Sequence, residues 1–277
     1  MKNILVVEDS ALVRNFLNDL LAKTGHRVTM ASNAEEALEK LQRENYDLIL
    51  LDVWLHKMNG LELLAKLRAA GKSATAVIMT ADDTPETLLT AVREQAFQYI
   101  RKPFEPKALL DVVELALAGG AEHLPIEVIS ARPEWVELVV PSDLHTAERI
   151  QVFLDQLKND LPAEVRDSVG RAFRELLLNA VEWGGRLDPN RKVRIACLRT
   201  RRMVLYRIAD PGQGFRLEDL PHAAVNNPPE DPLRHHQVRE EQGLRAGGFG
   251  LLMTRTFVDE LLFNEARNEV VFIKYLD

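Results

Sequence analysis

The stretch MKNILVVEDS, residues 1–10, sets a short apolar run, Ile4–Val7, directly before two acidic residues, Glu8 and Asp9. Four further apolar runs of this kind come later in the chain, and segments with the apolar spacing of helices separate them. The runs are 28–31, 48–51, 76–79 and 97–100, and the helix-like segments are 11–23, 34–42, 60–70, 85–94 and 106–117. This alternation predicts an α/β fold, a five-stranded parallel, doubly wound sheet with helices on both faces.

Polar groups follow four of these strands at the point where each strand ends. Glu8 and Asp9 follow the first run, Asp52 the third, Thr80 the fourth and Lys102 the fifth. Because the carboxyl ends of parallel strands meet at one edge of a sheet, we expect these side chains to lie together. Three carboxylates at one edge repel one another unless a divalent cation neutralises them, and oxygen ligands suit Mg²⁺. We therefore expect Glu8, Asp9 and Asp52 to ligate Mg²⁺.

A metal ion beside a carboxylate makes transfer of a phosphoryl group to that carboxylate feasible. In this arrangement Lys102 supplies a positive charge to the incoming phosphoryl oxygens, and the Thr80 hydroxyl donates a hydrogen bond to them. Acidic residues after strands also act as helix caps and turn formers, which is the plainer interpretation of any single one. Agreement of all five groups in strand order favours a phosphorylation site at Asp52.

Residues 1–118 resemble the receiver domain of two-component response regulators. The family's acidic pair matches Glu8 and Asp9, its phosphoacceptor aspartate matches Asp52, and its switch hydroxyl and lysine match Thr80 and Lys102. The resemblance implies that Asp52 accepts a phosphoryl group from a histidine kinase and that the Lys102–Pro103 peptide bond is cis. Tyr99 matches the family's aromatic switch position, and a half-buried strand tyrosine is the alternative interpretation.

The 277-residue chain is long enough for two domains, and a stretch with glycines and prolines divides it. We expect a receiver domain at 1–120, a linker at 121–134 and a second domain at 135–277, with Ile126–Ile129 open as a strand of either domain. The second domain has an α+β pattern, with strands predicted at 136–140, 193–198, 203–209 and 270–275 and helices at 146–157 and 163–183.

Charge and composition exclude several classes of protein. The chain carries 35 basic and 42 acidic residues, a net charge of −7, and no basic helix or zinc-ligand spacing indicates nucleic-acid binding. No apolar run nears the ~18–20 residues of a membrane span, and the run at 4–7 is shorter than a signal-peptide core of about 7–15 residues. The single cysteine, Cys197, cannot form an intramolecular disulfide. We expect a cytoplasmic protein with no direct contact to nucleic acid or membrane.

Two motifs of the second domain bring polar groups and glycines together. The helix segment RELLLNAVEWGG places Glu175 and Asn179 four residues apart, on one face. The segment DPGQGF, residues 210–215, follows a predicted strand, and Gly212 and Gly214 allow close backbone approach to a ring or a phosphate. Taken singly, the first is also interpretable as a solvated polar stripe and the second as a bare turn.

A third motif, RAGGFGLLMTRTF at residues 245–257, puts Gly247, Gly248 and Gly250 directly before a predicted helix. Exposed N–H groups and the helix dipole make such a helix start a ready anion site. A flexible loop is the plainer interpretation of the glycines alone. The order of the three motifs along the chain is what indicates a nucleotide-binding domain.

That order resembles the ATP-binding fold shared by gyrase, the Hsp90 chaperones, histidine kinases and MutL. Residues 136–277 are most similar to the anti-sigma-factor serine kinases of bacterial partner-switching systems. The resemblance implies that Asn179 ligates Mg²⁺ on the ATP phosphates and that Glu175 is the catalytic base that takes the proton of a substrate serine. Asp210 would accept a hydrogen bond from the adenine amino group.

The same resemblance implies roles for the glycines. Gly212 and Gly214 would line the base, and Gly247, Gly248 and Gly250 would close on the phosphates. Residues 216–246 would form a mobile lid. The chain departs from the branch at Trp183, where the branch often has histidine. His145 lacks the helical hairpin in which an orthodox histidine kinase carries its phosphorylated histidine.

We therefore expect a response regulator whose output is an ATP-dependent protein serine kinase. Its phosphodonor would be a histidine kinase, and its substrate an antagonist protein that competes with a sigma factor or another client for the kinase domain. The alternative is a binding module that binds ATP, or only keeps the fold, and sequesters a partner without phosphoryl transfer. Kinases of this branch are often dimers, which implies a homodimer.

Overall fold

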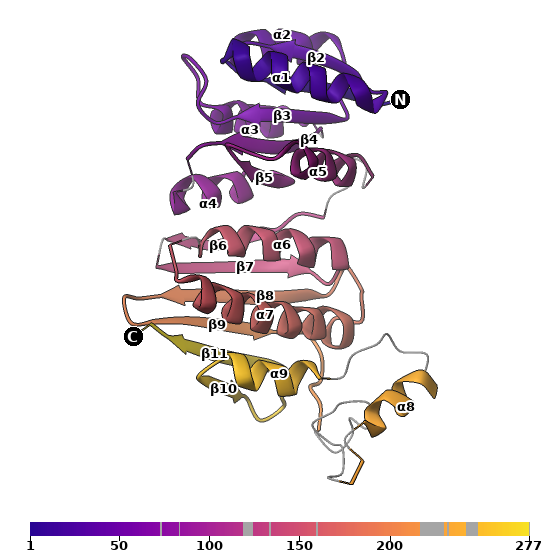
Figure 1. Ribbon diagram of the computed structural model, residues 1–277, viewed down its shortest axis with the longest axis vertical. Helices are drawn as coiled ribbons and strands as arrows, with labels where there is room; N and C mark the ends of the chain where they lie inside the picture. Colours follow the sequence, from indigo (N-terminus) through magenta and orange to yellow (C-terminus); the bar gives the residue numbers. More distant parts are fainter. Residues whose placement is uncertain are drawn as a thin grey trace. The chain divides into compact units, whose positions relative to one another are not determined.

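The structure of the protein is a computed structural model, and it describes residues 1–72, 74–82, 84–118, 124–132, 134–158, 160–216, 230–231, 233–241 and 249–276. The chain divides into two compact units, Met1–Pro125 and Ile126–Asp277, each with its own sheet (Figure 1). This division falls inside the stretch 121–134 that the sequence predicts as a linker. Among the described helices, none combines the length and apolar composition that crossing a bilayer requires.

The first unit is a five-stranded parallel sheet in the order β2-β1-β3-β4-β5. Its strands are β1 (Asn3–Val7), β2 (Arg27–Ala31), β3 (Leu48–Asp52), β4 (Thr75–Thr80) and β5 (Gln98–Arg101). The connecting helices are α1 (Ala11–Leu21), the short η1 (Ala22–Thr24), α2 (Ala34–Arg43), α3 (Gly60–Ala69), α4 (Pro85–Arg93) and α5 (Pro106–Ala118). The predicted α/β fold of this half is confirmed.

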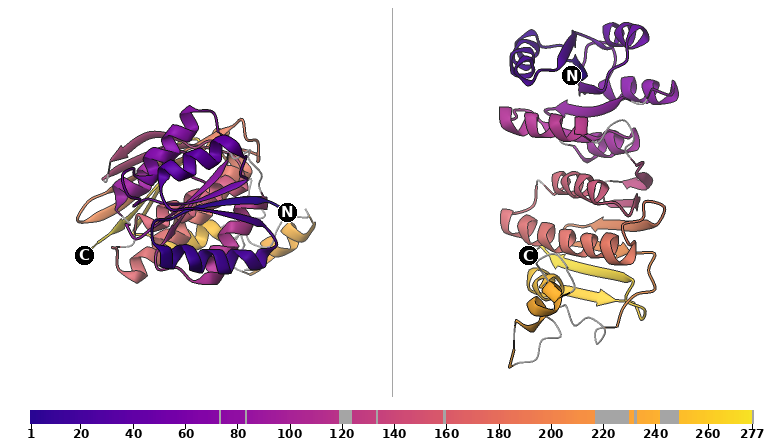
Figure 2. Two further views of the ribbon diagram at one scale, coloured as in Figure 1. Left: turned by 90° about the horizontal axis from the view of Figure 1, so that it is seen from above. Right: turned by 90° about the vertical axis from the view of Figure 1, so that its right-hand side faces the viewer.

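Alternation along the strands explains why helices cover both faces of this sheet (Figure 2). Ile4 and Val6 of β1 belong to a core cluster with apolar residues of α1 and α5. Leu5 and Val7 point to the other face and are also fully buried. Strands buried on both faces have continuous apolar runs in the sequence, and polar residues follow at their carboxyl ends. After β5 the Lys102–Pro103 peptide bond is cis, as the resemblance implies.

The second unit is a six-stranded antiparallel sheet in the order β10-β11-β9-β8-β7-β6. Its strands are β6 (Glu127–Arg132), β7 (Trp135–Pro141), β8 (Lys192–Arg199), β9 (Met203–Ala209), β10 (Glu260–Phe263) and β11 (Glu269–Tyr275). Helices α6 (Leu144–Gln156) and α7 (Ala163–Asn179) cover one face of the sheet, and α9 (Gly250–Phe257) packs against α7 (Figure 1). Helix α8 (Arg234–Glu241) lies between β9 and α9 in the sequence. The predicted α+β pattern is confirmed.

Three parts of this unit differ from the sequence prediction. β6 includes most of the segment 126–129 that was open to either domain, and it pairs with β7 of the second unit, with a register shift between Val128 and Ser130. The edge strand β10 has only four residues, too few for a clear pattern. The helix predicted at 163–183 is α-helical only to Asn179 and ends in a π-helical turn, Ala180–Gly184. Such turns are frequent at functional sites.

Candidate functional site

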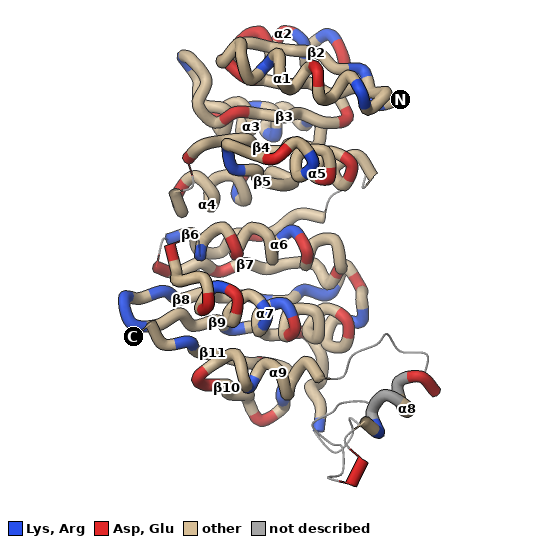
Figure 3. The backbone as a smooth tube through the Cα atoms, in the orientation of Figure 1, with Lys and Arg blue, Asp and Glu red and all other residues tan. Residues whose placement is uncertain are grey.

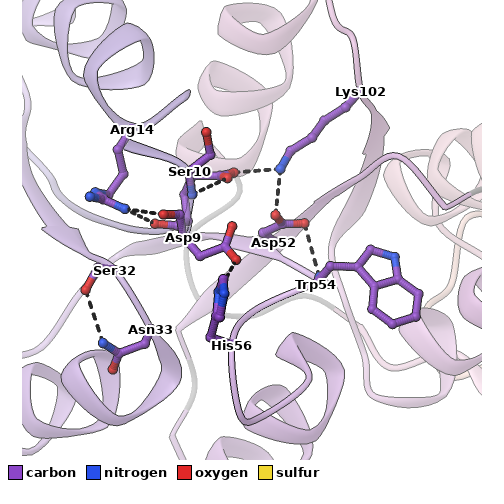
Figure 4. A network of polar contacts seen from close by, with 10 residues as sticks. Asp9, Ser10, Arg14, Ser32, Asn33, Asp52, Trp54, His56 and Lys102 are labelled. Carbon is purple, nitrogen blue, oxygen red and sulfur yellow. Dashed lines mark hydrogen bonds and ion pairs between the residues drawn. The ribbon is translucent and has the colours of Figure 1, made fainter. Parts of the chain in front are cut away.

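Three carboxylates meet at the carboxyl edge of the first sheet (Figure 4). Glu8 and Asp9 follow β1, Asp52 ends β3, and one oxygen of each lies within 4.8 Å of the others. Lys102, directly after β5, has its Nζ 2.6 Å from Glu8 Oε2 and 2.7 Å from Asp52 Oδ2. The structure thus brings together four residues that the sequence places at the ends of three different strands.

Burial sets the electrostatics of this cluster. Glu8 and Asp52 are buried, and burial raises the pKa of Glu8 although the hydrogen bond from Lys102 opposes it. Burial lowers the pKa of Lys102, but its hydrogen bonds with Asp52 and Glu8 outweigh burial, so its pKa is raised overall. Lys102 therefore keeps its single positive charge against three carboxylates. A hard oxygen cluster with excess negative charge fits Mg²⁺.

Thr80 and Tyr99 both bond to the segment that follows β4. Thr80 is fully buried, and its Oγ1 accepts a hydrogen bond from the Asp82 N–H at 3.0 Å. Tyr99 is 6% exposed, and its hydroxyl donates to the Asp82 carbonyl oxygen at 2.6 Å. Tyr99 is therefore a buried side chain bonded to the segment that follows Thr80. Its role as a switch stays a prediction.

Two residues that the sequence did not single out hold the acidic loop after β1 (Figure 4). Arg14 Nη1 donates to the main-chain oxygens of Glu8 at 2.7 Å and of Asp9 at 2.9 Å. His56 Nδ1 lies 2.6 Å from Asp9 Oδ2. Arg14 lies in the first turn of α1, close in sequence to Glu8 and Asp9, so the predicted helix start could have indicated its contact with them. His56 is 47 residues from Asp9, and no local pattern signals that contact.

In the second unit, a cavity of about 810 Å³ lies between α7, the start of α9 and the ends of β9 and β11. It is lined by six of the residues predicted to bind or act on a nucleotide, namely Glu175, Asn179, Asp210, Gly212, Gly214 and Gly250. Gly247, Gly248 and most of the predicted lid at 216–246 lie outside the described residues. The volume is typical of a small-molecule site, for which about 300–1,000 Å³ is usual.

Helix α7 presents the acid and the amide to this cavity. It buries one apolar face, formed by Val169, Ala172, Phe173, Leu176 and Leu177. Glu175 and Asn179 lie off that face and line the cavity. A Cβ added at Gly250, the first residue of α9, would lie 2.5 Å from Glu175 Oε2 and 3.8 Å from Asn179 Nδ2. The acid, the amide and the N-terminus of α9 therefore meet at one wall of the cavity.

Asp210 occupies the other end of the cavity. Its Oδ1 accepts a hydrogen bond from the Gly212 N–H at 2.7 Å, and its side chain abuts Gly184, where a Cβ would clash with the carboxylate. Burial raises the pKa of Asp210, although the Gly212 N–H and the charge of Arg191 oppose this. Among the described residues no hydrogen bond reaches Asp210 Oδ2, so this oxygen can accept one from a ligand. Gly184 belongs to the quoted WGG segment, but no pattern in the sequence signals its contact with Asp210.

Aromatic and basic side chains complete the wall of the cavity. Trp183 is 47% exposed and lines the cavity together with Phe215, Phe249 and Phe263. Five arginines also line it: Arg171, Arg174, Arg186, Arg191 and Arg267. Two of them lie on α7, where basic and acidic residues are interspersed (Figure 3). Flat apolar surface beside an excess of positive charge suits a ligand with a ring and phosphates.

Comparisons with known proteins identify the family of each domain. Residues 4–114 match the family model of the response regulator receiver domain, and residues 140–274 match that of the histidine kinase-like ATPase domain. The DNA-binding response regulator MtrA of Mycobacterium tuberculosis is 31% identical over 186 residues, which cover 67% of this chain and 79% of MtrA. The chain belongs to the response regulators. Its second domain is a histidine kinase-like ATPase domain.

Other proteins are similar to this response regulator over shorter stretches. The response regulator FleR of Pseudomonas aeruginosa is 34% identical over 139 residues, 49% of this chain and 29% of FleR. A CheY-like receiver domain from Methanospirillum hungatei, a solved structure, has 29% identity and a TM-score of 0.42 and covers 43% of this chain and 95% of that chain. The chain described here thus spans less than a third of the length of FleR.

The two domains imply bound groups, and the residues present fit them. A receiver domain implies a histidine kinase as phosphodonor, and an ATPase domain implies ATP. The carboxylates of Glu8, Asp9 and Asp52, within 4.8 Å of one another, suit Mg²⁺. In the ATPase domain, a Cβ at Gly184 would clash with Asp210, and one at Gly250 would press on the end of the Glu175 side chain. These glycines leave room for a nucleotide beside both carboxylates.

Proposed function

We propose that this response regulator is a phosphorylation-controlled protein serine kinase of a partner-switching pathway. Its substrate is an antagonist protein with a phosphorylatable serine. Unphosphorylated antagonist competes with a sigma factor or another client for the ATPase domain. The observation that carries the proposal is the cavity in which Glu175, Asn179 and Gly250 meet, with Asp210 at its other end.

Each polar residue of the cavity has one task in this proposal. When bound, Mg·ATP would supply the phosphoryl group, and its Mg²⁺ would supply positive charge that balances the negative phosphates. Asp210 accepts a hydrogen bond from the adenine amino group, because the Gly212 N–H engages only its Oδ1. Asn179 provides an amide oxygen as a Mg²⁺ ligand. Glu175, four residues away on the same helix face, accepts the proton of the serine hydroxyl.

The receiver domain supplies the control. Asp52 accepts the phosphoryl group from the histidine kinase, and Lys102, which holds Asp52 at 2.7 Å, becomes the partner of the new phosphoryl oxygens. The Thr80 hydroxyl then donates to the phosphoryl group. Because Thr80 and Tyr99 both bond to Asp82, this step changes the segment after β4 and the surface around 97–107. That surface biases the ATPase domain between its active and inactive states.

A Glu175→Gln variant tests the assignment of the base. Full-length wild-type and variant protein, each with the proteins that co-purify with it, would receive Mg·ATP, and phosphoserine would be counted by mass spectrometry. We expect wild type to phosphorylate a partner and the variant to do so about 10²–10⁴-fold more slowly, because a general base contributes that factor. ATP affinity should be unchanged. Glu164→Gln, on the same helix outside the cavity, is the control and should keep the wild-type rate.

The alternative, a module that sequesters a partner without phosphoryl transfer, draws on Trp183, which lines the cavity where the serine kinase branch often has histidine. If wild type binds Mg·ATP and no co-purifying partner gains phosphoserine, sequestration is the better account. If Glu175→Gln transferred phosphoryl groups at the wild-type rate, only the assignment of Glu175 as the base would be contradicted, and the kinase proposal would stand.

A further inference from the structure

The hydrogen bonds of the receiver site leave one carboxylate oxygen uncommitted. Both oxygens of Glu8 have partners, Ser10 N at 3.2 Å and Lys102 Nζ at 2.6 Å. Both oxygens of Asp52 have partners too, Trp54 N at 3.3 Å and Lys102 Nζ at 2.7 Å. Asp9 has a side-chain partner on Oδ2 only, and within the described part of the chain no hydrogen bond reaches its Oδ1. Asp9 is therefore the carboxylate that is ready to offer an oxygen to a metal ion.

The partner on Asp9 Oδ2 is His56, at 2.6 Å from its Nδ1 (Figure 4). A carboxylate only accepts hydrogen bonds, so Nδ1 carries the hydrogen and donates it. The His56 side chain is 83% exposed, whereas that of Asp9 is 24% exposed. Because so exposed an imidazole could bond to water instead, packing does not impose this contact. The bond engages Oδ2 of Asp9 and leaves Oδ1 for another partner.

The loop that carries His56 is anchored to the phosphoacceptor strand. Gly60 N donates to Val53 O at 2.8 Å, and a Cβ at Gly60 would clash with the Asp52 carbonyl oxygen. Asn59 caps α3 by accepting from Leu61 N at 2.8 Å. These contacts hold the loop after β3 close to Asp52, and His56 extends from it to Asp9. His56 thus links the loop after the phosphoacceptor strand to the acidic loop after β1.

We propose that His56 is a positioning residue of the receiver's metal site. Its hydrogen bond to Oδ2 orients Asp9 so that Oδ1 faces a divalent cation held by Glu8, Asp9 and Asp52. Hydrogen-bond partners of metal ligands typically contribute about 10–100-fold to metal affinity, because they remove rotational freedom from the ligand. The proposal concerns the receiver alone and stands or falls independently of the kinase function.

Titration of the full chain with Mn²⁺ in ATP-free buffer tests this directly, because free Mn²⁺ is counted by its EPR signal. We expect His56→Ala to bind Mn²⁺ about 10–100-fold more weakly than wild type. His56→Gln, which keeps an N–H donor, should recover part of the loss. Lys57→Asn is the matched control, since Lys57 is the exposed neighbour on the same loop and its φ of 73° suits asparagine. It should bind Mn²⁺ at least as well as wild type.

A second readout separates positioning of the metal from chemistry at Asp52. Phosphorylation of Asp52 by phosphoramidate would be followed against Mg²⁺ concentration. In His56→Ala the half-saturating Mg²⁺ concentration should rise by the same factor as the Mn²⁺ dissociation constant, and the rate at saturating Mg²⁺ should stay at the wild-type level. Equal Mn²⁺ affinity of His56→Ala and wild type would overturn the proposal. A reduced plateau with an unchanged half-saturating concentration would overturn it as well.

Discussion

Lys102 is the only lysine or arginine side chain that the described structure shows paired with both Glu8 and Asp52. Removing it leaves two buried carboxylates without their ion-pair partner. Lys102→Ala should therefore lower the free energy of unfolding of the receiver unit by about 3–5 kcal/mol in buffer with EDTA. Excess Mg²⁺ should restore part of this loss, because the cation replaces the missing charge. Urea unfolding with and without Mg²⁺ measures both effects.

The pH dependence of this ion pair depends on the raised pKa of Lys102. A group with a raised pKa contributes stability that is fully present below its unfolded value, 10.5 for lysine, and lost as pH rises through the folded value. The contribution is thus present throughout the neutral range. Lys107→Ala is the control, because its pair with Asp111 is exposed and should not measurably affect unfolding. An equal effect of both variants would contradict the role given to Lys102.

The ionised Asp210 carboxylate is expected to lower the stability of the ATPase domain, because it is partly buried for ligand binding. Burial raises its pKa, so the folded protein holds the ionised form at a cost that is present above the raised pKa and disappears as pH falls below the unfolded value of 3.8. Asp210→Asn should therefore raise the Tm of the ATPase domain at neutral pH, and the gain should shrink toward acidic pH. Calorimetric scans across that range measure it. A lower Tm at neutral pH would contradict the assignment.

At the scale of elements, the loop 210–215 depends on the turn between β10 and β11. Asp210 N donates to Asn268 O at 2.8 Å, and Asn268 Nδ2 donates to Gly212 O at 3.0 Å. Gly214 has φ +81°, and a Cβ there would clash with the Ala266 carbonyl oxygen. The sequence predicted neither β10 nor this turn, although the turn holds the loop that carries Asp210.

Gly214→Ala should destabilise the ATPase domain by about 2 kcal/mol or more, because strain at positive φ adds to a backbone clash. Gly71→Ala is the matched control. It has φ +69° with no atom within 4 Å of its Cβ position, so it should cost only the strain, about 1–2 kcal/mol, in the unfolding of its own unit. Denaturant unfolding of each variant gives both values. A Gly214→Ala cost no greater than that of Gly71→Ala would show that the loop can move away from the turn.

At the scale of the whole molecule, the sequence predicts the repeated βα units and the residues at the strand ends. The βα alternation predicts the first sheet, and the ends of its strands point to Glu8, Asp9, Asp52, Thr80 and Lys102. The contact of His56 with Asp9 spans 47 residues and depends on the loop path, so no pattern along the chain contains it. A strand at 126–129 was open to either domain, because the segment lies beside glycines and prolines, and only the pairing of β6 with β7 assigns it to the second unit. Local periodicity predicts elements, whereas contacts between loops require the folded chain.

We propose that the receiver domain controls ATP binding by the second domain of the same chain. The test is calorimetric titration of Mg·ATP into the full chain and into Asp210→Asn, each with and without beryllofluoride at Asp52. We predict that wild type binds, that the variant binds at least about 10-fold more weakly because a charged hydrogen-bond acceptor is lost, and that beryllofluoride shifts the wild-type affinity by about 5–150-fold. No binding by wild type in either receiver state would contradict the account.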